Sequence, residues 1–263
     1  MDRIAAGCDI GSLTAKAVIL SDGRVLAARI IDVKSRPEEA ARSVMDLALA
    51  DAGLSRETLG CCVGTGYGGK QIPFADEVVS EIACHGRGAR WLLPSARTVI
   101  DIGGQDCKVV KIDKEGRIVK FITNDKCAAG TGRFLDVMAK LLGVTLGELG
   151  ELSARAKKPL TFASTCTVWA QAEVIHKLND GETIEDIGGA INEAMANRVV
   201  IMVNTIGAEA DVCMTGGVSK NVGVVKAMEK LLGLRIKKLR VDPQVVGALG
   251  AAIVAQEKLK GGR

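Results

Sequence analysis

Aromatic side chains are scarce in this sequence, in which phenylalanine, tryptophan and tyrosine make up only 3% of 263 residues. The core must therefore be built from valine, isoleucine, leucine, alanine and methionine, and a hydrophobic content of 48% is ample for that. A basic stripe with interleaved aromatics is also missing, and 35 basic against 31 acidic residues leave a net charge of only +4. These absences argue against a nucleic-acid partner.

Long hydrophobic runs are missing too. The longest, Val245–Ala255, is too short for a bilayer, which requires about 20 apolar residues. The first predicted strand starts within a few residues of Met1, and no separate apolar region of a signal peptide precedes it. We therefore expect a cytoplasmic protein without a membrane partner.

Metal-binding histidine pairs are absent. The two histidines, His85 and His176, have no metal partner at helical spacing, so we expect them to be structural or solvated. Cysteine is not scarce, but in the cytoplasm its eight copies are not expected to form disulfides. Six of them lie in or beside predicted strands and helices and are expected to pack in the core. These six are Cys8, Cys61, Cys62, Cys84, Cys107 and Cys213.

One short pattern occurs twice in the chain. Residues 9–16 read Asp-Ile-Gly-Ser-Leu-Thr-Ala-Lys, and residues 101–108 read Asp-Ile-Gly-Gly-Gln-Asp-Cys-Lys. Each copy predicts a strand, a glycine loop, a second strand, a polar turn and a third strand. A duplicated unit suggests two lobes of similar build, and the alternation of strands with helices predicts an α/β fold with mixed sheets.

The repeated pattern has the chemistry of a phosphate site. An aspartate at the end of a buried strand, Asp9 or Asp101, can hold Mg²⁺ through water molecules. The glycines allow backbone N–H groups to approach phosphate oxygens, and Ser12 and Thr14 add hydroxyl donors. Two such loops that face each other would bind a polyphosphate from both sides. The alternative is a pair of ordinary β-hairpins with glycine turns.

A second glycine-rich stretch, residues 64–71, nearly matches the P-loop pattern G-x-x-x-x-G-K-[ST]. Gln71 lacks the hydroxyl that binds magnesium in that motif. Pro73 stands where the following helix should be in its first turn, and it disfavours helical angles at Ile72. We therefore predict a glycine-rich turn after a strand, whose backbone is accessible to a ligand, rather than a P-loop.

A third nucleotide element is predicted at residues 211–221, where a strand runs into the Gly216-Gly217 turn and then a helix. Such a turn presents bare backbone to a flat ligand such as adenine or ribose. The alternative is a strand–helix turn that needs glycine for its backbone angles alone. Two Asp-x-Gly loops followed by a Gly-Gly turn resemble the actin, Hsp70 and sugar-kinase superfamily. That resemblance implies a bilobed ATPase fold with the nucleotide between the lobes.

The resemblance assigns roles residue by residue. Asp9 and Asp101 would hold hydrated Mg²⁺, and Gln105 or Asp101 would orient the attacking water. Gly216 and Gly217 would flank the adenosine of ATP or ADP, and Gln244 would close over it. The two phosphate loops would be lined by Gly11, Ser12, Leu13, Thr14, Ala15, Lys16, Gly103 and Gly104.

The expected lobes follow from the same resemblance. Residues 1–95 would form the first lobe, onto which a closing helix at 245–263 packs back. Residues 96–244 would form the second lobe, which carries the adenosine turn.

Two cysteines stand apart from the other six. Cys127 and Cys166 lie in polar loops near predicted helix N-termini, with Ser164 or Thr165 as the expected cap of the second helix. A helix N-terminus stabilises a thiolate or a negatively charged iron–sulfur centre. One chain offers two such thiols, whereas a [4Fe–4S] cluster requires four, which a symmetric dimer would supply. The alternative is that both are buried cysteines that behave as small apolar residues.

The segments Asn-Asp-Lys-Cys-Ala-Ala-Gly-Thr-Gly-Arg-Phe-Leu and Ser-Thr-Cys-Thr-Val, with Asp-Ile-Gly-Gly-Gln-Asp, resemble the activators of 2-hydroxyacyl-CoA dehydratases, which are related to the ATPase subunits of benzoyl-CoA reductase. The resemblance implies a homodimer with one [4Fe–4S] cluster held by Cys127 and Cys166 of both subunits. It also implies ATP-driven transfer of single electrons to a partner iron–sulfur enzyme, with ferredoxin or flavodoxin as donor. A sugar kinase and a nucleotide-dependent sensor with a structural cluster remain as alternatives.

Overall fold

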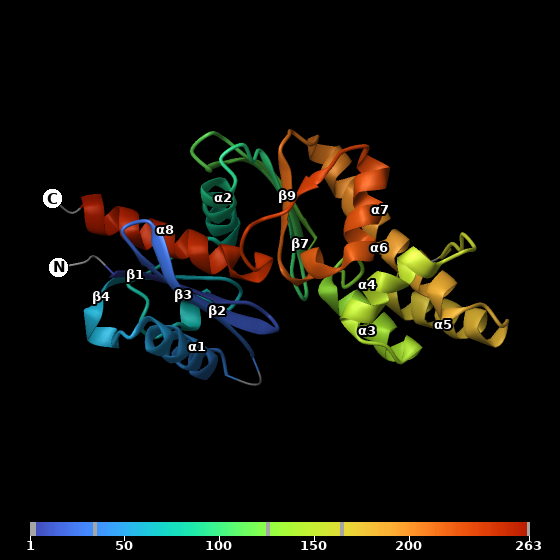
Figure 1. Ribbon diagram of the computed structural model, residues 1–263, viewed down its shortest axis with the longest axis horizontal. Coiled ribbons are helices and arrows are strands. Elements are labelled where there is room, and N and C mark those ends of the chain that lie inside the picture. The colour runs from blue at the N-terminus through green and yellow to red at the C-terminus, as the bar shows by residue number, and fades with distance from the viewer. Residues whose placement is uncertain (1–3, 34–35, 125–126, 164–165, 262–263) are drawn as a thin grey trace. The chain divides into compact units, whose positions relative to one another are not determined.

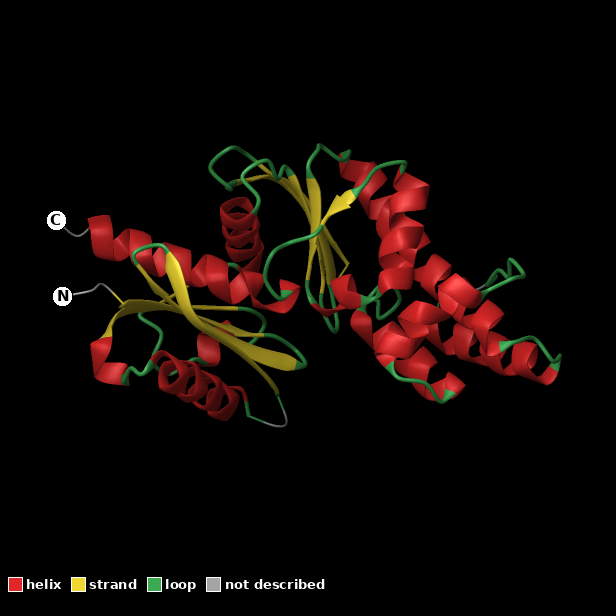
Figure 2. Ribbon diagram, viewed as in Figure 1, coloured by secondary structure: helices red, strands yellow, loops and turns green. Residues whose placement is uncertain are grey.

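The computed structural model describes residues 4–33, 36–124, 127–163 and 166–261, and Figures 1 and 2 show it by chain position and by secondary structure. Two compact units make up the chain. The first comprises Met1–Val99, Val110–Lys120 and Leu239–Arg263, and the second comprises Ile100–Val109 and Phe121–Lys238. The lobe boundaries expected from the sequence stay a prediction.

The first sheet has the order β3-β2-β1-β4-β5. Its strands are β1 (Ile4–Ile10), β2 (Thr14–Ser21), β3 (Arg24–Asp32), β4 (Leu59–Thr65) and β5 (Glu77–Val78). β1 pairs antiparallel with β2, with Asp9 opposite Lys16, and parallel with β4, with Asp9 opposite Thr65. This sheet is therefore mixed, and its register brings the repeated aspartate and lysine together.

Alternate side chains of β1 and β2 enter two different cores. Ala6, Cys8 and Ile10 pack with α1 (Pro37–Ala52), while Ala5 packs with α8 (Val246–Gly261) on the other face. Figure 1 shows these two helices on opposite sides of the first sheet. Since side chains alternate along a strand, Asp9 points to the same face as Ala5, towards α8.

Helix α8 approaches its neighbours closely through glycine. A Cβ on Gly250 would lie 1.8 Å from the carbonyl oxygen of Cys84 in α2 (Glu81–Leu92), and a Cβ on Gly7 of β1 would lie 2.0 Å from the carbonyl oxygen of Ala248. No side chain fits at such distances. The glycines therefore fix how α8 packs on both α2 and β1.

We expect Gly250→Ala to destabilise the protein by about 3 kcal/mol or more, because the new methyl group would collide with backbone that cannot yield locally. Urea unfolding measures the change. Gly261→Ala in the same helix is the matched control, since no atom lies within 4 Å of the added Cβ. A loss below about 1 kcal/mol in Gly250→Ala would contradict this packing.

The second sheet has the order β8-β7-β6-β9-β10, which repeats the order of the first. Its strands are β6 (Thr98–Ile102), β7 (Cys107–Ile112), β8 (Ile118–Asn124), β9 (Val212–Thr215) and β10 (Ile236–Lys237). Five helices lie between β8 and β10 in the chain: α3 (Gly132–Leu142), α4 (Leu146–Arg155), α5 (Thr167–Asn179), α6 (Ile184–Ile206) and α7 (Val222–Leu232). The duplicated α/β fold class is thereby confirmed.

Local expectations fail at two segments. The sequence of residues 77–90 alone predicts a helix over that whole range, but Glu77–Val78 pair with β4 and the helix begins only at Glu81. The sequence alone also predicts a strand between Pro159 and Cys166, but none forms at 160–163, the described part of that segment. At Glu77–Val78, pairing with β4 decides what short-range sequence preference cannot. Among the described residues, no helix is both long and apolar enough to cross a membrane.

Candidate functional site

The first phosphate loop, residues 9–16, closes the turn between β1 and β2. The N–H of Gly11 donates to the carbonyl oxygen of Thr14 at 3.0 Å. Asp9 is buried, and the Nζ of Lys16 lies 3.3 Å from its Oδ2. Ser12, Leu13 and Thr14 are partly exposed, whereas Ala15 is buried. The loop therefore offers backbone and hydroxyl groups above a buried, ion-paired carboxylate.

Two glycines enclose Asp9: Gly66, which belongs to the glycine-rich turn predicted at residues 64–71, and Gly247, which the sequence did not single out. Gly66 has a φ of +88°, and a Cβ there would lie 2.3 Å from Asp9 Oδ1. A Cβ on Gly247 would lie 2.9 Å from Asp9 Oδ2 and 3.0 Å from His85 Nε2. Both carboxylate oxygens therefore face bare backbone. His85 is buried, in agreement with its expected structural role, and its ring reaches the same glycine as Asp9.

The second phosphate loop, residues 101–108, repeats this geometry. The N–H of Gly103 donates to the carbonyl oxygen of Asp106 at 3.0 Å. Asp101 is buried, and its Oδ2 lies 3.7 Å from the Nζ of Lys108. The two loops differ at four of their eight positions, and one of these differences changes the ion pairing. Asp106 stands where the first loop has Thr14, and its Oδ2 lies 2.6 Å from the Nζ of Lys108. Lys108 therefore has two carboxylate partners.

The Gly-Gly turn lies directly beside Asp101. Thr215 at the end of β9 donates through Oγ1 to Asp101 Oδ1 at 2.8 Å. Gly216 has a φ of +82°, and a Cβ on it would lie 2.3 Å from the carbonyl oxygen of Ile102. The structure thus unites Asp101, Gly216 and the neighbouring Gly217 in one half-site. The pair Thr65-Gly66 is the counterpart of Thr215-Gly216 in the first unit, so the stretch that resembles a P-loop is the other copy of this turn.

Helix α3 begins on the second phosphate loop. The carbonyl oxygens of Gly103 and Gly104 accept hydrogen bonds from the N–H groups of Gly132 and Arg133, both at 2.8 Å. These two N–H groups are free in the first turn of a helix and require partners outside it. The exposed Gln105 follows immediately. A movement of this loop therefore acts directly on the start of α3.

Burial separates the cysteines into two classes. Cys127 and Cys166 are exposed, whereas the six cysteines expected in the core are all buried. Burial raises the pKa of Cys84 to about 11 and that of Cys213 to about 12, which keeps these thiols protonated. The alternative that Cys127 and Cys166 are core residues is therefore wrong.

Hydrogen bonds to the backbone hold both cysteine loops. Asn124 Nδ2 donates to the carbonyl oxygens of Cys127 at 3.1 Å and Ala129 at 3.0 Å. Glu173 of α5 accepts from the N–H of Ala163 at 2.9 Å, three residues before Cys166. No sequence pattern indicated these hydrogen bonds, because each depends on how the loop folds back on itself.

The two cysteines lie differently at their helices. Cys166 is itself the N-cap of α5, whereas Cys127 lies in the loop before Thr131, the N-cap of α3. The expected caps Ser164 and Thr165 lie outside the described residues. Since the residue just before α5 is Cys166, the predicted cap position was wrong.

A cavity of about 400 Å³ lies in the second unit between α4, α6 and α7. Small residues open it, among them Ala154, Gly189 and Gly223, and lysines such as Lys157 and Lys226 line it. Val222 and Gly223, a few residues after Gly217, form one wall. The cavity therefore combines room for a small molecule with positive charge close to the Gly-Gly turn.

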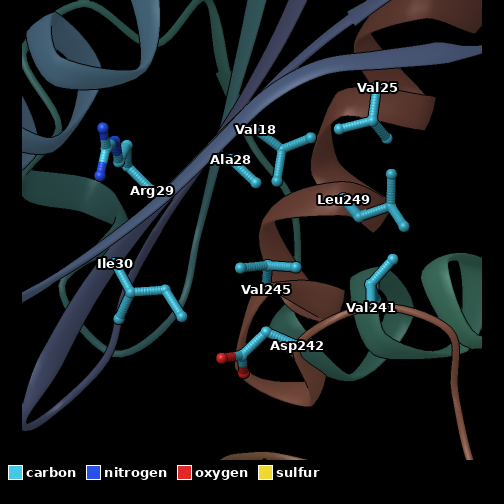
Figure 3. A pocket seen from close by; sticks show the side chains of 9 residues that line it. All are labelled: Val18, Val25, Ala28, Arg29, Ile30, Val241, Asp242, Val245 and Leu249. Carbon is cyan, nitrogen blue, oxygen red and sulfur yellow. The ribbon is translucent and has the colours of Figure 1, made fainter. Parts of the chain in front are cut away.

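A second cavity, of about 300 Å³, lies in the first unit between the β2–β3 face and the start of α8, as Figure 3 shows. Apolar side chains such as Val18 and Leu249 form most of its wall, with Arg29 and Asp242 at its edge. Gln244 lies beside it in the turn Pro243–Val245, where its N–H donates to Asp242 Oδ1 at 3.0 Å. The structure thus places Gln244 in the first unit.

Among residues 4–33, 36–124, 127–163 and 166–261, no three histidine, cysteine or acidic side chains form a group that could hold a metal ion. Two exposed thiols are half the ligand set of a four-cysteine cluster. Hydrated Mg²⁺ needs only one or two carboxylates, and Asp9 and Asp101 are of that kind.

In a comparison with known protein families, residues 6–255 match the BadF/BadG/BcrA/BcrD ATPase family. The activator of lactoyl-CoA dehydratase from Anaerotignum propionicum is 45% identical over 255 residues, which cover 95% of this chain and 96% of the relative.

Two solved structures are similar over almost the whole chain. Component A of the (R)-2-hydroxyglutaryl-CoA dehydratase of Acidaminococcus fermentans has a TM-score of 0.94 at 42% identity, covering 98% of this chain and 99% of its own. The activator of the 2-hydroxyisocaproyl-CoA dehydratase from Clostridium difficile, with bound ADPNP, has a TM-score of 0.93 at 43% identity, covering 98% and 96%. A glucokinase of the ROK family from Streptomyces griseus shares the fold alone, at a TM-score of 0.59 and 13% identity, covering 97% and 99%.

Proposed function

This chain belongs to the BadF/BadG/BcrA/BcrD ATPase family, and from that membership we propose that it hydrolyses ATP to drive single electrons into a partner iron–sulfur enzyme. The partner that its relatives indicate is a 2-hydroxyacyl-CoA dehydratase. Reduced ferredoxin or flavodoxin is the proposed donor. The observation that carries the proposal is the exposure of Cys127 and Cys166 while every other cysteine is buried.

Cys127 and Cys166 are the proposed ligands of a [4Fe–4S] cluster, which a second copy of the chain completes with the same two residues. Such a cluster, when bound, supplies one-electron redox chemistry at low potential. Asn124 and Glu173 hold the two loops by hydrogen bonds to the backbone. Cys166 stands at the N-terminus of α5, where the helix dipole favours negative charge.

The phosphate loops are the proposed sites of ATP binding in both units. Asp9 and Asp101 would hold hydrated Mg²⁺, while the loop glycines turn their N–H groups towards phosphate oxygens. Lys16 and Lys108 keep these buried carboxylates paired. Gln105, exposed at the tip of the second loop, is the proposed residue that orients the attacking water.

The coupling between nucleotide and cysteines is proposed to run through α3. Its first N–H groups bond to Gly103 and Gly104, and the hydroxyl of its N-cap Thr131 donates to the carbonyl oxygen of Ala128, next to Cys127. A shift of the second loop on hydrolysis would therefore move the start of α3 and the Cys127 loop together.

The cavity between α4, α6 and α7 is the proposed subsite for the base of the nucleotide, because it follows the Gly-Gly turn and its small residues leave room for a flat ring. We expect Ala154→Trp to weaken ATP binding at least tenfold, or about 1.4 kcal/mol, by filling this cavity. Isothermal titration measures the affinity. Glu151→Trp on the same helix, which does not line the cavity, is the control, and equal affinities in both variants would contradict the assignment.

The alternatives predict different behaviour. A sugar kinase of this fold would survive loss of Cys127, and its product would be a sugar phosphate. A sensor with a structural cluster would show little ATP turnover even with reductant and partner present. The close relatives are named as dehydratase activators, which favours the electron-transfer function over both.

The experiment that tests the proposal is anaerobic iron and sulfide analysis combined with an absorption spectrum and the solution mass. About four irons per dimer, bleached by dithionite, are expected. Added acceptor enzyme should then be reduced only while ATP is hydrolysed. A colourless, iron-free protein after attempted reconstitution would overturn the electron-transfer function.

A further inference from the structure

A half-buried cation lies beneath one of the two cysteine loops. Arg198 of α6 places its guanidinium carbon 5.7 Å from the ring centroid of Phe134, in the first turn of α3. Gly130, in the loop that carries Cys127, has a φ of +85°, and a Cβ on it would lie 3.6 Å from Arg198 Cβ and 3.9 Å from its Cδ. The loop therefore rests on the aliphatic part of this side chain.

The same arginine is within electrostatic range of both exposed cysteines. Burial lowers the pKa of Arg198, and the negative charge that Cys127 and Cys166 can carry acts against that shift. Among the described residues, no carboxylate forms an ion pair with Arg198. Within the part of the chain that the structure describes, the two cysteines, 39 residues apart in sequence, thus share a cation that has no acidic partner.

We propose that Arg198 is the positioning residue that stabilises negative charge held jointly by Cys127 and Cys166, and that it raises both the retention and the reduction potential of the cluster bound there. The inference rests on the proposed function. The inference goes beyond the proposed function because it assigns a tuning role to Arg198, which belongs to neither phosphate loop and to neither cysteine motif.

The physical reason is the charge that reduction adds. A cluster with thiolate ligands gains a further negative charge when it accepts one electron, and its potential depends on net charge and surroundings. Arginine keeps its positive charge at all ordinary pH values, and partial burial protects that charge from screening by salt. A fixed cation at this position therefore favours the reduced form of the cluster and the retention of an anionic cluster alike.

The test compares reduction potentials in anaerobic titrations with dithionite, followed by absorption, with iron per dimer as the second readout. For Arg198→Gln we expect the ratio of reduced to oxidised protein at a fixed potential to fall about tenfold, equivalent to about 59 mV. Arg198→Lys keeps the charge and should recover most of this loss. Arg235→Gln removes an equally charged but highly exposed arginine of the second unit and should leave the ratio unchanged.

Each outcome decides the question. If Arg198→Gln binds its full complement of iron and its ratio of reduced to oxidised protein is unchanged, the inference is overturned and the proposed function stands. The same holds if Arg235→Gln changes this ratio as much as Arg198→Gln does. Loss of iron that Arg198→Lys restores supports the inference, whereas loss in both variants shows that the guanidinium has a packing role and overturns it. If Arg198→Gln does not fold, Arg198→Met keeps an apolar side chain in contact with Gly130 while it removes the charge. Its reduction potential and iron content are then compared with those of the wild type. A wild-type protein without iron overturns the proposed function itself.

Discussion

Cys166→Ser is expected to remove the iron from the protein and to lower ATP-dependent reduction of an acceptor enzyme by more than about a hundredfold, since even partners of metal ligands are worth 10–100-fold. The exchange replaces one sulfur by oxygen at an exposed position, so the fold should persist. In a symmetric dimer it removes two of four ligands at once. Iron content and the visible spectrum of the anaerobic protein measure the loss.

Cys61→Ala is the matched control for this prediction. Cys61 is buried in β4 and should lose only packing, about 1 kcal/mol, while the iron stays bound. Cys127→Ser should behave as Cys166→Ser does. Retention of the full iron content in either serine variant would contradict the proposed ligands and return the sugar kinase to consideration.

Asp101→Asn is expected to slow ATP hydrolysis by about 10²–10³-fold, the usual cost of losing one charged or hydrogen-bonding group aimed at the reacting phosphate. The substitution keeps the shape of a buried side chain and removes only its charge. It should also be well tolerated, because Lys108 keeps Asp106 as a partner at 2.6 Å. Phosphate release under saturating ATP measures the effect.

Asp113→Asn provides the comparison. Asp113 lies in the turn after β7, where it binds Arg117 through Oδ2 at 2.7 Å, outside both phosphate loops. Its loss should leave the hydrolysis rate unchanged. If Asp101→Asn hydrolyses ATP at the wild-type rate, the second loop is not the catalytic loop, and the phosphate chemistry must be sought at Asp9.

The repeated Asp-Ile-Gly pattern predicted much of the fold, because two similar sequences are expected to form similar strands that pack in the same way. The two sheets indeed share one strand order, and Asp9–Lys16 recurs as Asp101–Lys108. Cys127 and Cys166 were also predicted as a pair apart from the rest. In each case the prediction rests on a short motif, whose residues are close together in sequence.

The missing parts depend on contacts between distant segments. Gly66, directly after β4, encloses Asp9, near the end of the neighbouring β1. The residues around Gly66 resemble a P-loop, which is a phosphate loop of another kind, so the sequence did not indicate this contact. Arg198 is one of many basic residues on helices, and only the packing of α6 against the loop at Gly130 distinguishes it. Glu77–Val78 became a strand because β4 offered it a free edge.

The hydrogen bonds at the start of α3 limit how the second phosphate loop can respond to a lost phosphate. The carbonyl oxygens of Gly103 and Gly104 are both committed to N–H groups of α3, so these peptide groups cannot flip without breaking them. A glycine loop would otherwise absorb strain by rotating its peptides. In the proposed coupling, a displacement of this loop would therefore tilt the whole of α3, which is about 16 Å long at 1.5 Å per residue, and the helix would act as a lever.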